Sequence, residues 1–204
     1  MVAGRRPGQA ALGFSVHTGW ACVVAVSGSG TSVAVLDRRR LEMIPGSDPE
    51  SPPFVYHAAR KLPLEAAGRL VRESAELSGA KATAALRAAV GELAAREYQV
   101  VAGGVIVGDR PVAAPLETVL RSHSFVHAAE GEMFRGAVRS AAQALGIPVI
   151  DVRVGDLRSR AATALGIPDA KVAEALAEIG RAAGRPWAKD HKDACLAASI
   201  ALLT

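Results

Sequence analysis

The hydrophobic pattern of the first part of the chain predicts β-strands. An apolar run rich in strand-forming residues extends from Ala11 to Val26 and is interrupted by His17-Thr18-Gly19. A second short run covers Thr31–Leu36, and a third covers Arg38–Ile44. Ser27-Gly28-Ser29-Gly30 is a turn signal. The connections are too short to contain a helix, so we expect an antiparallel meander of three strands.

The remainder of the chain alternates between helical and strand-like patterns. Ala, Leu, Glu and Arg dominate from about Phe54 to Glu97, which predicts a helical stretch that Pro63 and Gly79 divide. The apolar runs Val100–Val107 and Ile147–Val152 predict buried strands. Because helices separate these strands, we expect them to be parallel neighbours. Further helices are expected at about His127–Leu145, Leu157–Leu165, Asp169–Ala183 and Lys189–Leu203.

This order of elements predicts an α/β fold with a mixed five-stranded sheet. The antiparallel meander comes first, and parallel strands that alternate with helices follow it. The chain has 204 residues, half of them hydrophobic, which is enough for one domain with a sizeable core. We expect residues 1–10 to be a flexible basic tail and residues 11–204 to be that single domain.

The charge and the cysteine content limit the possible partners and the cellular compartment. The net charge of +4 permits nucleic-acid binding, but dispersed arginines in an Arg-rich, Ala-rich chain give the same number. Cys22 and Cys195 both lie in apolar runs and form no disulfide or zinc pattern. No segment has the composition of a signal peptide or a membrane span. We therefore expect a cytoplasmic protein without a membrane partner.

Two local sequences carry a resemblance to a known family. The segment from Leu12 to Trp20, Leu-Gly-Phe-Ser-Val-His-Thr-Gly-Trp, is similar to the first strand and turn of RuvC-type Holliday-junction resolvases. Asp190-His191-Lys192-Asp193-Ala194 resembles the start of their last helix. Together with the order of elements, these segments make the chain resemble the ribonuclease H-like superfamily, and within it the RuvC-type enzymes.

The resemblance implies hydrolysis of phosphodiesters with two divalent cations, Mg²⁺ or Mn²⁺, held by carboxylates. Residue by residue, the Asp of the family's first strand falls on Ser15, and its central acid falls near Ile106 to Gly108. Asp109 is close enough to substitute if the register differs. The acids of the last helix fall on Asp190 and Asp193. By this comparison about half of the metal site remains.

Each candidate residue also has a structural interpretation. Asp190 and Asp193 either retain part of a metal site or serve as the acidic first turn of a helix. His17 is either a ligand or proton-transfer group beside the site, or a turn residue. The run Arg38, Arg39 and Arg40 either contacts phosphates or protects an exposed strand edge with charge.

A second cluster of candidate ligands lies in the middle of the chain. His123, His127 and Glu130 would share one face of a continuous helix and could converge on a transition metal. Alternatively, Ser122 or Ser124 caps the helix, which would leave His123 outside it.

Three hypotheses for function follow. The missing carboxylate at Ser15 favours a non-catalytic or weakly active domain that binds nucleic acid or another ligand. The alternative is a nuclease dependent on Mg²⁺ or Mn²⁺ with a rearranged site, built from Asp190, Asp193 and either Asp109 or Glu130. The third is a structural protein whose Ala-rich helix faces form a homodimer.

Overall fold

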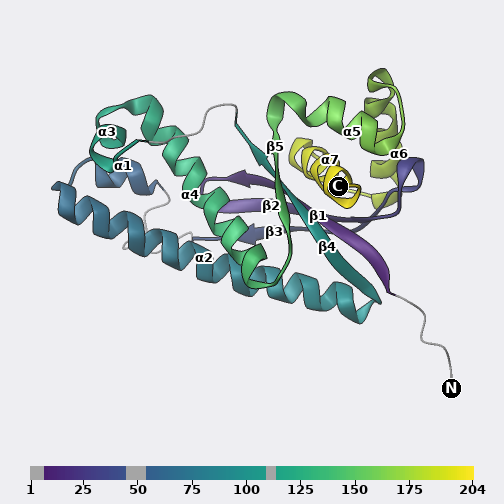
Figure 1. Cartoon of the computed structure of the whole chain (residues 1–204), viewed down its shortest axis with the longest axis horizontal. Helices are drawn as coiled ribbons and strands as arrows, with labels where there is room; N and C mark the ends of the chain where they lie inside the picture. Colours follow the sequence, from purple (N-terminus) through teal and green to yellow (C-terminus); the bar gives the residue numbers. More distant parts are fainter. Residues whose placement is uncertain (1–6, 45–53, 109–113) are drawn as a thin grey trace.

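The structure, a computed structural model, describes residues 7–44, 54–108 and 114–204. Its centre is a five-stranded sheet with the order β3-β2-β1-β4-β5 (Figure 1). The first three strands are antiparallel, and β4 and β5 are parallel to β1. The predicted mixed sheet is therefore confirmed. The strands are β1 Gly8–His17, β2 Trp20–Ser27, β3 Ala34–Glu42, β4 Tyr98–Val107 and β5 Val149–Arg153.

The single apolar run at the start of the chain forms two strands. β1 and β2 pair as a hairpin around Gly19, which has a φ of 80°. The carbonyl oxygen of Gly19 also accepts hydrogen bonds from the backbone of Met43 and Ile44 after β3. Gly8 already belongs to β1, so the expected tail is too long at its C-terminal end. Residues 1–6 lie outside the described part of the chain.

The expectation of separate strands at Thr31–Leu36 and Arg38–Ile44 is wrong. The end of the first run and most of the second belong to one strand, β3, which has an irregularity where the runs meet. Ala25 pairs with Asp37, whereas the next residue, Val26, pairs with Val35. A β-bulge at this point shifts the side-chain alternation by one residue. One continuous strand therefore has the hydrophobic pattern of two.

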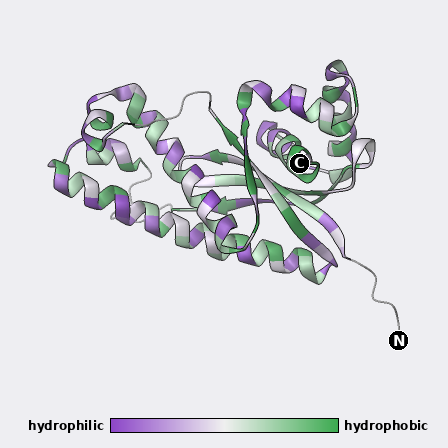
Figure 2. Cartoon of the chain, viewed as in Figure 1, coloured by the Kyte–Doolittle hydropathy of each residue, from purple (hydrophilic) through white to green (hydrophobic). Residues whose placement is uncertain are grey.

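Helices cover both faces of the sheet (Figure 1). α2 and α4 pack against side chains such as Leu12 and Phe14 on one face. α5, α6 and α7 pack against Cys22 and Val24 on the other face. Figure 2 shows that α2 and α4 carry hydrophilic residues between their apolar ones, as expected for helices with one face in water. The helices are α1 Val55–Ala59, α2 Leu64–Ala95, α3 Leu116–Arg121, α4 His123–Ala144, α5 Leu157–Leu165, α6 Val172–Ala183 and α7 Lys189–Leu202, with 3₁₀ turns at Gly30–Ser32, Val154–Asp156 and Asp169–Lys171.

Two predicted features of the helices differ from the structure. α2 passes through Gly79 without a break, because residues on both sides of it, such as Leu70 and Leu86, pack into the core that α2 shares with α4, and this packing offsets the low helix propensity of glycine. Pro63 does separate α1 from α2, as expected. The segment from Leu116 to Arg121, expected as loop, forms the short helix α3. None of the described helices is long and apolar enough to cross a membrane.

Close contact between α7 and the sheet fixes the position of this helix. A Cβ atom on Gly13 of β1 would lie 1.8 Å from the carbonyl oxygen of Ala194, and one on Gly104 of β4 would lie 2.4 Å from that of Ala197. The two glycines therefore let the helix backbone approach the strand backbone directly. This approach brings the first turn of α7 to the C-terminal end of β1.

Candidate functional site

Ser15 and Asp190 lie together where β1 meets the start of α7. Ser15 is directly opposite Cys22 on β2, which belongs to the core beneath α7, so the Ser15 side chain points to this face. Its hydroxyl donates a hydrogen bond of 3.3 Å to Oδ1 of Asp190. Ser15 is 9% exposed. The position that corresponds to the family's first Asp therefore serves as a neutral partner of the remaining carboxylate.

His17 approaches the same carboxylate from the end of β1. Its Nε2 atom lies 3.0 Å from Oδ1 of Asp190, without the geometry of a hydrogen bond. The imidazole stacks on Trp20, with ring centroids 4.2 Å apart and an interplanar angle of 12°. The guanidinium of Arg40 lies 3.9 Å from the centroid of the Trp20 ring. His17, Trp20 and Arg40 thus form a stacked group, of which His17 contacts Asp190.

Asp193 does not share the environment of Asp190. Its carboxylate forms an ion pair with Lys189, one helical turn earlier, and it lines a recess with Leu157 and Leu176. The expectation that Asp190 and Asp193 form the core of a metal site is therefore not met by their present side-chain positions. Across the three described ranges, no group of three carboxylate, imidazole or thiolate ligands gathers at this face.

The central strand supplies no carboxylate. β4 contains no Asp or Glu from Tyr98 to Val107. Phe14 pairs with Val105, so the residue opposite Ser15 is Ile106, whose side chain packs into the core beneath α7. Asp109 lies outside the described residues. The described part of the central strand thus presents an apolar side chain, that of Ile106, opposite Ser15.

The carboxylate of β5, that of Asp151, lies on the other face of the sheet. Asp151 pairs in register with Val105, a core residue on the side of α2 and α4. Both of its carboxylate oxygens accept hydrogen bonds from Arg139 of α4, at 2.9 and 3.0 Å. Such a two-pronged ion pair fixes α4 against the edge of the sheet. Asp151 therefore cannot substitute for the acids absent from Ser15 and Ile106.

The fold as a whole is similar to two solved structures of RuvC. The structure of Thermus thermophilus RuvC in complex with a Holliday junction substrate matches with a TM-score of 0.56 and 16% identity. Another Thermus thermophilus RuvC structure matches with a TM-score of 0.51 and the same identity. Each match covers 94% of this chain and 91% of the other. The chain has the RuvC fold. No family model and no curated protein matches its sequence.

On this RuvC-like fold, Arg38 acts within the molecule. β3 is the edge strand, as its charged residues suggested. Arg38 donates hydrogen bonds of 2.6 and 3.0 Å to the carbonyl oxygens of Gly184 and Arg185. This arginine therefore anchors the loop that leads from α6 to α7.

The other two arginines of the run point to opposite faces of the sheet. Arg39 forms ion pairs with Asp37 and with Glu92 of α2, both at 2.5 Å. Arg40 pairs with Glu42 and stacks over the ring of Trp20. Of the three, only Arg40 combines substantial exposure, 55% of its side chain, with a position beside Ser15 and His17. It is the arginine best placed to contact a ligand at this face.

Glu130 is not a partner of the two aspartates. α4 packs against one face of the sheet and α7 against the other, so the expected combination with Asp190 and Asp193 is wrong. Only 2% of Glu130 is exposed. Its carboxylate accepts hydrogen bonds from the backbone of Val55 at 2.6 Å and of Tyr56 at 3.1 Å. Burial raises the pKa of this carboxyl, although these bonds and His57 act in the opposite direction.

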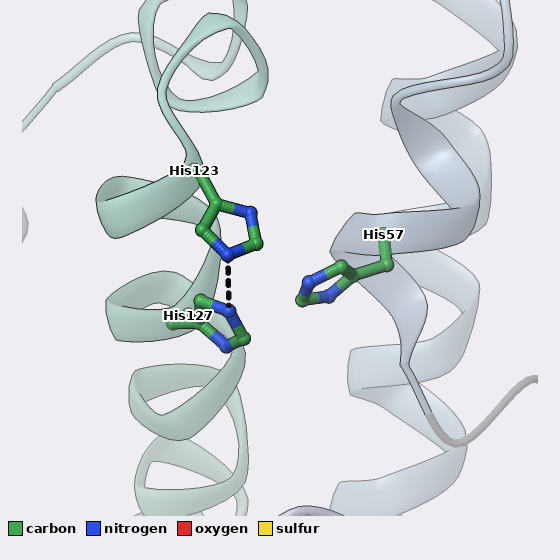
Figure 3. A group of neighbouring side chains, drawn as sticks. All are labelled: His57, His123 and His127. Atoms are coloured by element: carbon green, nitrogen blue, oxygen red, sulfur yellow. Dashed lines mark hydrogen bonds between the residues drawn. The ribbon is translucent and has the colours of Figure 1, made fainter.

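The predicted histidine pair is present and has a third member. Ser122 caps α4, its hydroxyl accepting a hydrogen bond from the backbone of Phe125 at 3.4 Å. This cap does not leave His123 outside the helix, as the alternative expected: α4 begins at His123, and His123 and His127 lie on one face. His57 of α1 completes a group whose ligand nitrogens all lie within 4.8 Å of one another (Figure 3). The sequence pattern missed His57 because it comes from a different helix.

The remaining large recess lies between α2, α3 and α4. Its volume is about 800 Å³, and its lining includes Val71, Leu116 and Met133 together with the charged Arg72 and Glu132. It lies on the side of the sheet away from Ser15 and Asp190. The Ala-rich faces of α2 and α4 largely pack against each other and the sheet, and a homodimer through these helices stays a prediction.

Proposed function

We propose that this chain is a RuvC-like domain that binds nucleic acid without hydrolysing it. The observation that carries the proposal is the hydrogen bond from Ser15 to Asp190. Two-metal hydrolysis needs several carboxylates to hold two divalent cations beside the scissile phosphate. Here a hydroxyl and the apolar Ile106 stand on the two strands where the resemblance to RuvC implies acids.

Three further features support a nucleic-acid partner. The net charge is +4, which favours association with a polyanion. His17, Trp20 and Arg40 form a stacked, partly exposed group beside Asp190. A solved structure of the same fold is that of a RuvC in complex with a Holliday junction substrate. A nucleic-acid partner also agrees with the cytoplasmic location that we expect from the sequence.

Binding and cleavage are tested separately. Fluorescence anisotropy would compare a four-way DNA junction with a duplex, a single strand and a structured RNA at several salt concentrations. We expect binding that weakens with salt. The same junctions, labelled at each 5′ end and incubated with Mg²⁺ or Mn²⁺, should remain intact on denaturing gels. An absence of binding to all four nucleic acids would contradict the proposal.

One arginine gives a matched test of the surface. Arg40→Ala removes an exposed cation beside Ser15 and His17, and Arg121→Ala removes an exposed cation of α3 that is also paired with a glutamate. If Arg40 contacts one phosphate, its loss should reduce the slope of log K against log salt by about 0.9. Arg121→Ala should leave the slope unchanged. Equal slopes in the two variants would place the nucleic acid elsewhere.

The second candidate function is a nuclease that uses Mg²⁺ or Mn²⁺ at a rearranged site. The retained carboxylate of Asp190 is the observation that favours it. Cleavage of a junction by the wild type that disappears in Asp190→Asn would establish this candidate and overturn the first.

A further inference from the structure

Three of the five histidines of the chain meet between α1 and the first turns of α4. Figure 3 shows the imidazoles of His57, His123 and His127 pointing toward one another. The ring centroids of His123 and His127 are 4.4 Å apart, and that of His57 lies 4.7 Å from His127 and 5.9 Å from His123. Three imidazoles at this spacing repel one another when protonated, so the grouping favours neutral rings, and two of them, His123 and His127, are joined by a hydrogen bond between their Nε2 atoms.

The spacing of the nitrogens fits a tetrahedral ion. The Nε2 atoms of His123 and His127 are 3.0 Å apart. Two imidazole nitrogens bound to one tetrahedral Zn²⁺ lie roughly 3.3 Å apart, given Zn–N distances of about 2.0–2.1 Å. The two residues are four positions apart on one helix, which places both rings on the same side. A third ligand from another element then defines one face of a coordination tetrahedron.

Glu130 supplies the support that metal-binding histidines commonly have. Its buried carboxylate oxygen Oε2 lies 3.4 Å from Nδ1 of His57. A metal-bound imidazole usually donates its other N–H to a carboxylate, which fixes the ring and its tautomer. This contact directs Nε2 of His57 toward the other two rings. Because Glu130 also caps the backbone of α1, the same residue positions both the helix and its histidine.

We propose that His57, His123 and His127 bind a transition-metal ion, with Zn²⁺ as the resident ion. Imidazole nitrogens suit zinc and its neighbours in the transition series, whereas Mg²⁺ and Ca²⁺ prefer oxygen ligands. The site has three protein ligands, and His123 and His127 are exposed, so water or an anion takes the fourth position. The ion ties the five-residue helix α1 to α4. This site is independent of the proposed binding of nucleic acid at the α7 face.

The first experiment measures the affinity for Zn²⁺ and the geometry of the site. Untagged, chelator-treated protein is titrated with Zn²⁺ in competition with a chromophoric chelator, and with Co²⁺ while its visible absorption is recorded. We expect one ion per chain and the intense Co²⁺ spectrum of a four-coordinate site. His57→Gln, His123→Gln, His127→Gln and the triple variant should lose this binding. A pale six-coordinate Co²⁺ spectrum would overturn the proposal.

The remaining two histidines provide the matched control. His17→Gln and His191→Gln remove imidazoles from the other side of the sheet and should leave the zinc affinity unchanged. Circular dichroism of the metal-free variants checks that each one folds, and the exposure of His123 and His127 makes those two substitutions the safest. Equal zinc affinity in the wild type and the triple variant would overturn the site.

Glu130→Gln tests the role of Glu130 in positioning His57 separately from the role of the histidines as ligands. It keeps an acceptor oxygen for α1 but removes the carboxylate behind His57. Loss of such an outer carboxylate typically weakens binding by about 10–100-fold. The four-coordinate Co²⁺ spectrum should persist, at higher Co²⁺ concentrations. The melting temperature should rise with added Zn²⁺ in the wild type and stay constant in the triple variant; a rise of equal size in both would contradict a site at these histidines.

Discussion

Two clusters of ionisable side chains, one at the α7 face and one between α1 and α4, differ in the residues that contact them. At the α7 face, Asp190 is in contact with a neutral hydroxyl and a histidine, and the neighbouring strand offers an apolar residue. At the α1–α4 end, three imidazoles converge in front of a buried carboxylate. The first arrangement lacks the charge that hard cations require, and the second has the ligands that transition metals prefer. The chain therefore combines the RuvC fold with an α7 face at which, among the described residues, no group of three metal ligands gathers.

The largest expected effect concerns the contact that positions Asp190. Gly13→Ala would place a Cβ atom on the backbone of α7, and we expect it to lower the free energy of unfolding by about 3 kcal/mol. Urea unfolding followed by circular dichroism measures this. The matched control is Gly91→Ala, at an exposed position of α2 with open space around it, which should raise the stability by about 0.5–1 kcal/mol. A harmless Gly13→Ala would show that α7 does not approach the sheet as described.

The next effect concerns the carboxylate behind the histidines. Glu130→Ala leaves the buried N–H of Val55 without a partner, so we expect a loss of about 2 kcal/mol in the metal-free protein. Glu117→Ala removes an exposed glutamate that pairs only with Arg121 and should change the stability by no more than about 0.5 kcal/mol. If both variants unfolded at the same urea concentration, Glu130 would not be the cap of α1.

A carboxylate placed at position 15 tests whether negative charge limits metal binding beside Asp190. Ser15→Asp places a second carboxylate beside Asp190 and should increase the affinity for Mn²⁺ by at least about tenfold, or 1.4 kcal/mol. The change is made in the variant that lacks His57, His123 and His127, so that no imidazole site competes. Ser15→Asn keeps the size without the charge and should leave the affinity unchanged. The same affinity in both variants would mean that charge at this position does not limit metal binding.

The smallest effect uses a thiol as a probe of Asp190. Burial, and then the charge of Asp190, raise the pKa of Cys22 to about 11. Burial also raises the pKa of Cys195 to about 12. Because the thiolate is the reactive form, both cysteines should be alkylated slowly until the protein unfolds. Asp190→Asn should lower the pKa of Cys22 slightly and leave that of Cys195 unchanged, as rates of alkylation against pH would show by mass spectrometry.

The fold was predictable because its signals are local. Apolar runs separated by helical segments were sufficient for the parallel arrangement of β4 and β5. The hydrophobic pattern was misleading where tertiary packing overrides the local preferences of the sequence. A bulge in β3 divided one strand into two apparent runs, and the packing of α2 against α4 and the sheet kept the helix continuous through Gly79.

The candidate sites were less predictable because their partners lie far apart in the sequence. The resemblance to RuvC was enough to associate Ser15 with Asp190, and the structure places them in contact. Helical spacing was enough to group His123 with His127. Nothing near His57 in the sequence indicates that α1 will dock against α4. The same docking turns Glu130 from an expected ligand into a buried cap.

The proposed function requires that the face beside Ser15 does not hold a divalent cation. The most direct measurement is Mn²⁺ binding, followed by electron paramagnetic resonance, in the variant that lacks His57, His123 and His127. We predict equally weak binding with Asp190 present and with Asp190→Asn. Binding at least about tenfold tighter, a difference of 1.4 kcal/mol, that disappears in Asp190→Asn would contradict the proposed function.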